Sequence, residues 1–108
     1  MPTNIEVIFC TYPDRESAEK TARLLVEKRL AACANIVPGL TSIYTWQDKI
    51  EAAQEHLLMI KTSGNVYPVL ETAIIEHHPY ELPEIISIPV EHGLPDYLHW
   101  INSWLSAN

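Results

Sequence analysis

The order of strand-like and helix-like segments along the chain is the feature that most constrains its fold. Residues 5–12, 32–37 with 40–47, 50–62 and 84–91 are rich in the β-branched and aromatic residues typical of strands. The segments that follow Asp14, Asn65 and Pro95 instead carry apolar residues at helical spacing. The predicted order is therefore strand, helix, strand, strand, helix, strand, helix.

Two prolines indicate how the strands are arranged. The first six elements match the split βαβ pattern of an α+β ferredoxin-like fold, an antiparallel sheet with strand order 4-1-3-2, here followed by an extra C-terminal helix. A proline cannot donate a ladder hydrogen bond, so within a sheet it is confined to edge strands and bulges. Pro38 and Pro89 fall in the second and fourth strands, which are the two edges in this order.

Local signals predict where the helices begin and end. Asp14 is a good N-cap for the first helix, and we expect Lys28 and Arg29 in its last turn, where positive charge suits the helix dipole. With Asn65 as N-cap, Pro68 falls in the first turn of the second helix, where its missing N–H costs nothing. Pro79 favours extended geometry at His78 and so ends that helix. Pro95 opens the last helix.

Length and charge limit the classes of function. At 108 residues the chain fits one domain, residues 1–108, and its 47% hydrophobic content suffices for one core. Seven Lys and Arg against fourteen Asp and Glu give a formal charge of −7, which disfavours nucleic-acid binding. The acidic surface suits a cation binder and equally suits simple solubility. We see no signal peptide or membrane span, and two separated cysteines suggest a reducing, cytoplasmic location.

Several long blocks carry a family resemblance. Residues 30–46, LAACANIVPGLTSIYTW, and residues 77–86, HHPYELPEII, strongly resemble the signature of the CutA divalent-cation tolerance family. Residues 10–14 and 95–101 resemble its remaining blocks, in order, and only Thr45 and Leu94 depart from the usual pattern. The resemblance implies a ferredoxin-like homotrimer associated with copper tolerance and copper binding. It also implies that metal ligation maps onto Cys10, His77 and His78.

The predicted topology is compatible with that ligand set. Thiolate and imidazole suit copper and also zinc. The first strand and the second helix run in the same direction, so Cys10, His77 and His78 should share one end of the domain, whereas Cys33 should lie at the other end. Two of these candidate ligands have an ordinary alternative to metal binding. Cys10 can be a small buried hydrophobe, and His77 can be a hydrogen-bonded core or interface histidine. Neighbouring helical side chains diverge by about 100°, so the two histidines chelate one ion only if His78 leaves helical geometry.

Other features bear on assembly and chemistry. The second and third strands are long, and Tyr44 and Trp46 lie on one face of them, either packed against the last helix or covered by further subunits. There is no nucleophile elbow, P-loop or GxGxxG motif, so we expect no enzyme. An alternative function is a trimeric signalling or scaffolding module, similar to the PII proteins, that binds a small effector between subunits.

Overall fold

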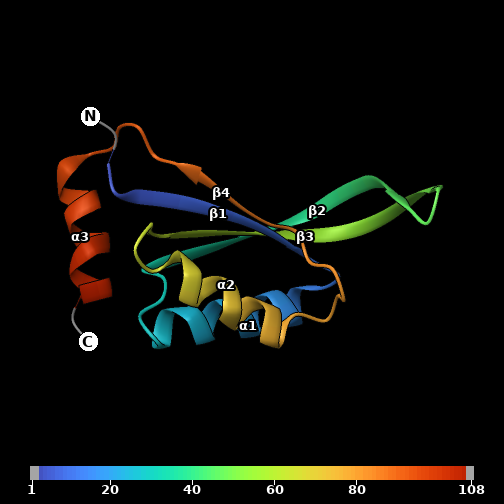
Figure 1. The fold of residues 1–108 in the computed structure, drawn as a ribbon, viewed down its shortest axis with the longest axis horizontal. Helices are drawn as coiled ribbons and strands as arrows, with labels where there is room; N and C mark the ends of the chain where they lie inside the picture. The colour runs from blue at the N-terminus through green and yellow to red at the C-terminus, as the bar shows by residue number, and fades with distance from the viewer. Residues whose placement is uncertain (1–2, 107–108) are drawn as a thin grey trace.

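A computed structural model describes residues 3–106 and confirms the predicted fold (Figure 1). Four antiparallel strands form one sheet in the order β2-β3-β1-β4, which is the predicted order read from the other edge. The elements are β1 (Ile5–Tyr12), α1 (Arg15–Glu27), β2 (Cys33–Trp46), β3 (Lys49–Ser63), α2 (Tyr67–His77), β4 (Ile85–Pro89) and α3 (Pro95–Ser106).

The two helices α1 and α2 pack against one face of the sheet, where the main core lies (Figure 1). Alternate residues of a strand point to the same face, so alternate residues in the second half of β1 and near the end of β3 enter this core. Each contributes fully buried side chains that meet Leu25 of α1 and Leu70 and Ile74 of α2. The residues from the central strands are Ile8, Cys10, Tyr12, Leu58 and Ile60.

The C-terminal helix α3 stands at one end of the sheet and forms a second, smaller core (Figure 1). Ile101 and Leu105 of α3 are buried against Ile5 and Ala32. Arg29, which follows α1, holds α3 in place by two contacts with Trp104. Its guanidinium donates to the Trp104 carbonyl at 3.0 Å and lies 3.6 Å from the centre of the Trp104 indole ring. Within residues 3–106, most of the sheet face opposite α1 and α2 has no helix over it (Figure 1).

Two helix ends differ from the sequence prediction. Helix α1 ends at Glu27, so Lys28 is its C-cap and its last turn holds no basic residue. Arg29 follows with a φ of 59°, a left-handed conformation that commonly ends helices and that Gly usually occupies. The predicted cap Asn65 is also wrong by one position: Val66 is the N-cap of α2, and it makes no side-chain capping bond. Pro68 does lie in the first turn.

The long β2–β3 hairpin projects from the body of the protein (Figure 1). The radius of gyration is 14.5 Å, against roughly 13 Å for a compact chain of this length, and the longest dimension is 44 Å. Both prolines fall on edge strands as predicted, and a register shift between Val37 and Leu40 accommodates Pro38 and Gly39. Gly39 has a φ of 79°, which a residue with a side chain adopts only with strain.

Candidate functional site

Cys10, His77 and His78 lie toward the same end of the domain, where β1 finishes and α2 finishes (Figure 1). Cys10 is the sixth of the eight residues of β1, His77 is the last residue of α2, and His78 is the C-cap with a ψ of 136°. His78 has thus left helical geometry, as Pro79 predicts. The two imidazoles consequently point in different directions and have different surroundings.

The thiol of Cys10 is buried inside the core that α1 and α2 cover. The residue is 0% exposed, and burial raises the pKa of the thiol to about 12. Burial raises a thiol pKa because the thiolate loses its hydration in an apolar environment. Only the thiolate is a good metal ligand, so Cys10 as it stands is a protonated, sequestered thiol at neutral pH.

Both ring nitrogens of His78 are already engaged. The backbone N–H of Tyr80 donates to Nδ1 at 3.0 Å, which makes Nδ1 the acceptor and places the ring proton on Nε2. Nε2 then donates to the carbonyl of Thr11 at 2.8 Å. Burial lowers the pKa of His78, so this neutral tautomer is favoured. The ring also stacks on Tyr12, with centroids 4.2 Å apart.

His77 is exposed, although its place in the apolar stripe of α2 allowed a core position. Its Nδ1 donates to the Ala73 carbonyl at 2.9 Å, one helical turn earlier, because a carbonyl can only accept. Nε2 is the remaining nitrogen of this ring. His77 lines an open groove between the start of α1 and the end of α2, beside Asp14, Glu16 and Glu76.

These three side chains do not form a ready metal site in this conformation. Within residues 3–106, no three His, Cys, Asp or Glu side chains are grouped closely enough to hold a metal ion. The Cys10 thiol is protonated and buried, and both nitrogens of His78 are occupied by hydrogen bonds. The present arrangement therefore does not fit copper, and ligation by Cys10, His77 and His78 stays a prediction that requires a rearrangement.

Sequence reasoning missed two residues of this region, Glu55 and Tyr80. The Glu55 carboxyl is buried at 8% exposure, and the Tyr80 hydroxyl donates to its Oε2 at 2.6 Å. Burial and this hydrogen bond raise the pKa of Tyr80. The Tyr80 ring also lies against His78, with centroids 4.9 Å apart. One signal was present in the sequence: Tyr80 stands between two prolines in the loop after α2.

Cys33 is separate from the candidate site. It pairs with Lys61, and Lys61 pairs with Val7, so Cys33 lies two strands away from β1 and three residues out of level with Cys10. Three residues along a strand span about 10 Å, and two strand spacings add about 10 Å sideways. Both cysteines are free thiols. The Cys33 thiol is partly exposed and donates to the Asn35 side chain at 3.8 Å.

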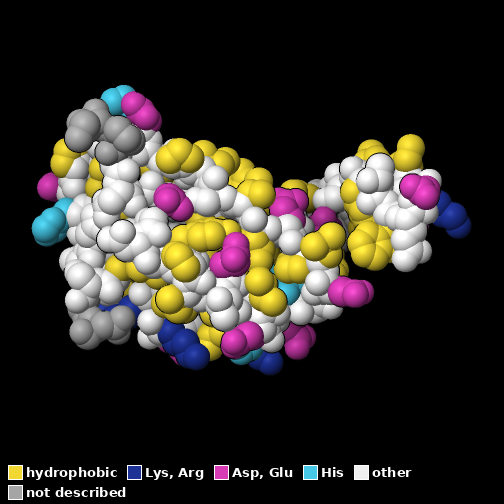
Figure 2. All heavy atoms as spheres, in the orientation of Figure 1, with side chains coloured by type: hydrophobic (Ala, Val, Ile, Leu, Met, Phe, Trp, Pro, Cys, Tyr) yellow, Lys and Arg dark blue, Asp and Glu magenta, His cyan; other side chains and the backbone are white. Residues whose placement is uncertain are grey.

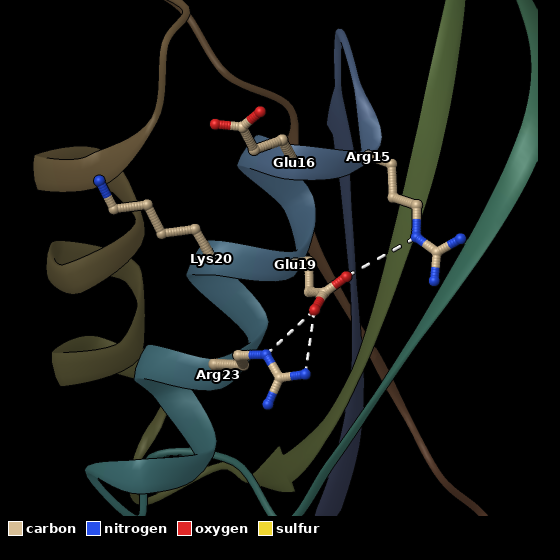
Figure 3. A pocket seen from close by; sticks show the side chains of 5 residues that line it. All are labelled: Arg15, Glu16, Glu19, Lys20 and Arg23. Carbon is tan, nitrogen blue, oxygen red and sulfur yellow. Dashed lines mark hydrogen bonds and ion pairs between the residues drawn. The ribbon is translucent and has the colours of Figure 1, made fainter.

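A second hollow on the surface of α1 offers no comparable chemistry (Figure 3). Glu19 lies between Arg15 and Arg23, 3.7 Å and 3.0 Å from their nitrogens, one helical turn to either side. Such exposed pairs are worth little and neutralise one another. The hollow is therefore an ordinary charged helix surface.

Within residues 3–106, no helix has the length and apolar character needed to cross a membrane. The profile of a family described as "CutA1 divalent ion tolerance protein" matches residues 6–104. Protein CutA of Mus musculus is 47% identical over 94% of this chain, and the chain spans only 58% of that relative's length. The divalent-cation tolerance protein CutA of Thermus thermophilus is 48% identical over 89% of this chain and 93% of its own length.

Solved structures agree with the family profile. CutA of Xylella fastidiosa superposes with a TM-score of 0.94 at 46% identity, covering 96% of this chain and 100% of its own. A protein of Archaeoglobus fulgidus described as a periplasmic divalent cation tolerance protein gives 0.92 at 38% identity, over 94% and 99% of the two chains. The fold, the profile and these relatives together show that the chain belongs to the CutA1 divalent ion tolerance family.

Proposed function

We propose that this member of the divalent-cation tolerance family binds copper, with Cys10, His77 and His78 as its ligands. The observation that supports the proposal best is the meeting of β1 and the end of α2. The His78 ring contacts the carbonyl of Thr11, the residue directly after Cys10. A thiol and two imidazoles are a soft donor set, which favours copper, with zinc as a second candidate.

Copper titration tests this site directly. We expect Cys10→Ser, His77→Ala and His78→Ala to weaken the binding of Cu(I). The titration is carried out under anaerobic conditions, with a competing chelator that buffers the free Cu(I) concentration. Cys33→Ser and His99→Ala are matched controls, because they remove the same donor types outside the site. Unchanged stoichiometry and affinity in all three site variants would refute the assignment.

The same proposal includes assembly into a homotrimer. The face of the sheet opposite α1 and α2 is apolar and largely uncovered: Phe9 and Val7 on β1 pair with Ile86 and Ile88 on β4, which are 50% and 45% exposed. Figure 2 shows hydrophobic side chains over the β4 edge of the sheet and on the projecting hairpin. An apolar area of this extent favours burial against further copies of the chain.

The hairpin supports a ring rather than a simple face-to-face pair. Ile43 and Ile50 are 74% and 80% exposed, and Tyr44 and Trp46 remain 44% and 43% exposed rather than packing on α3. A projecting arm that covers a different surface on its neighbour is a heterologous contact, which must close into a ring to avoid an open fibre. The number three comes from the family resemblance.

We also propose a cytoplasmic, non-enzymatic role. Two free cysteines fit a reducing compartment. The relatives are named for tolerance of cations rather than for a reaction. The alternative, a PII-like effector module, is tested by calorimetry of the metal-free protein against Cu(I), Zn(II) and ATP. Nucleotide binding without metal binding would reverse the ranking of the two functions.

A further inference from the structure

We infer that four polar side chains on the sheet face opposite α1 and α2 bind the carboxylate group of a small organic acid: Cys33, Asn35, Lys61 and Tyr97. The first three come from β2 and β3, and Tyr97 comes from the first turn of α3. The site lies away from Cys10 and goes beyond the proposed copper function, so neither proposal depends on the other.

Lys61 is a lone charge on an apolar surface. Residues alternate between the two faces of a strand, so Lys61 lies on the face opposite the core residue Ile60. Its neighbours across the sheet are Val7 and Cys33. Where all four described strands run side by side, the remaining positions of this face are uncharged: Val7, Phe9, Cys33, Asn35, Met59, Ile86 and Ile88. Among residues 3–106, no carboxylate forms an ion pair with Lys61.

Hydrogen-bond donors outnumber acceptors around Lys61. Its ammonium group donates to Oδ1 of Asn35, and the Cys33 thiol donates to the same oxygen at 3.8 Å. An ammonium group has three N–H donors, and the Asn35 amide nitrogen adds two more. In the described part of the chain, these remaining N–H groups make no further hydrogen bond to protein. The cluster is therefore suited to a ligand that brings acceptor oxygens and a negative charge.

Tyr97 extends this cluster and gives it an apolar wall. Burial, and then the charge and hydrogen bonding of the neighbouring Cys33 thiol, raise the pKa of the Tyr97 hydroxyl, which therefore lies beside that thiol. The Tyr97 ring stacks on Trp100, with centroids 5.6 Å apart and an interplanar angle of 23°. The two side chains remain 40% and 48% exposed. A flat aromatic surface thus borders the polar donors.

These features together indicate the class of ligand. Phosphate groups are usually held by several cations or by the backbone N–H groups at the start of a helix. A single ammonium group with neutral donors beside it matches the one charge and two oxygens of a carboxylate. The formal charge of −7 further disfavours polyanions. The Tyr97 and Trp100 rings favour a planar apolar group next to the carboxylate.

Protection of Cys33 from alkylation measures occupancy of the site. Benzoate is the probe, and benzamide is an uncharged control of the same shape. Cys10 is 0% exposed and Cys33 is partly exposed, so iodoacetamide should modify only Cys33 in the folded protein. We expect benzoate to slow this reaction in a saturable manner and benzamide to leave its rate unchanged. Trp100→Ala should weaken protection by benzoate more than protection by acetate.

Variants of the polar residues test which groups hold the carboxylate. Lys61→Gln should weaken protection by benzoate about tenfold to a hundredfold, because it removes a charged hydrogen-bond donor. Lys49→Gln is the matched control: it makes the same change of charge at an exposed position of the hairpin and should behave like the parent. Tyr97→Phe keeps the ring and loses the hydroxyl. It should weaken protection about threefold to tenfold, which preserves the test if Lys61→Gln fails to fold.

Three results would overturn the site: no protection by benzoate, equal protection by benzamide, or full protection in every folded variant of Lys61 and Tyr97. Sedimentation velocity tests a different occupant, a second copy of the chain. If Cys33 reacts only after the parent dissociates and Lys61→Gln is monomeric, a neighbouring copy supplies the carboxylate and the small-acid site is refuted. Copper titration of the same variants should be unchanged, so failure of the copper proposal leaves this one standing.

Discussion

Ile50, in the projecting β2–β3 hairpin, gives the sharpest test of assembly. The side chain is 80% exposed in the protomer, and it pairs with Thr45 across the hairpin. Fully burying an isoleucine is worth about 1.5–3 kcal/mol, so covering this one contributes about 1.2–2.4 kcal/mol per protomer. Three copies in a ring then contribute about 4–7 kcal/mol, or roughly 10³–10⁵ in the association constant of the trimer.

Ile50→Lys should therefore produce monomers at micromolar concentration, since it removes this contribution and adds the cost of desolvating an ammonium group. The change takes the formal charge from −7 to about −6, so a general increase in repulsion between acidic copies cannot explain dissociation.

Sedimentation velocity over a concentration series measures the result, with circular dichroism to confirm folding. Ile75→Lys is the control, because Ile75 is 56% exposed on α2, away from the hairpin and the uncovered sheet face. It should sediment like the parent protein. An Ile50→Lys protein with the sedimentation coefficient of the parent, or a parent that is monomeric throughout, would refute the reasoning on assembly.

Three further predictions concern stability. Leu58→Ala should lower the free energy of unfolding by about 2–5 kcal/mol in urea titration, because Leu58 is fully buried between the sheet and both helices. Asp14 caps α1 by accepting from the Ser17 N–H at 2.7 Å, and this bond lowers the pKa of the Asp14 carboxyl. The capping bond therefore stabilises the fold above the unfolded-state pKa of Asp14, and this stabilisation is lost as the pH falls. Asp14→Ala should accordingly flatten the acid limb of a plot of unfolding free energy against pH. Arg29→Lys should lower the free energy of unfolding by about 1 kcal/mol and alter the fluorescence of Trp104. A lysine ammonium group cannot both cover the indole face and donate to the Trp104 carbonyl, as the planar guanidinium of Arg29 does.

Much of the fold can be predicted from the positions of the prolines in the sequence. Pro38 and Pro89 each exclude a central strand, and the sheet places both on its edges. The end of α1 was less predictable, since a left-handed Arg29 takes the place where glycine is the usual signal. The conformation of Arg29 is compensated by its contacts with Trp104, 75 residues away, and no local pattern contains that information.

The candidate site divides in the same way. The directions of β1 and α2 are enough to bring Cys10, His77 and His78 to one end of the domain. The topology predicted from the sequence fixes those directions. The engagement of both His78 nitrogens and the burial of Glu55 depend on contacts between distant segments. Periodicity placed His77 in an apolar stripe, yet it lies one turn beyond Ile74, past the part of α2 that the sheet and α1 cover.

Anomalous diffraction at the copper edge, from crystals exposed to copper under reducing conditions, tests the copper assignment most directly. We predict one peak per protomer within bonding distance of the Cys10 sulfur and of at least one of the two imidazoles, with the His78 ring displaced from the Thr11 carbonyl. Copper peaks only at other donors, with Cys10 still buried in the core, would contradict the account.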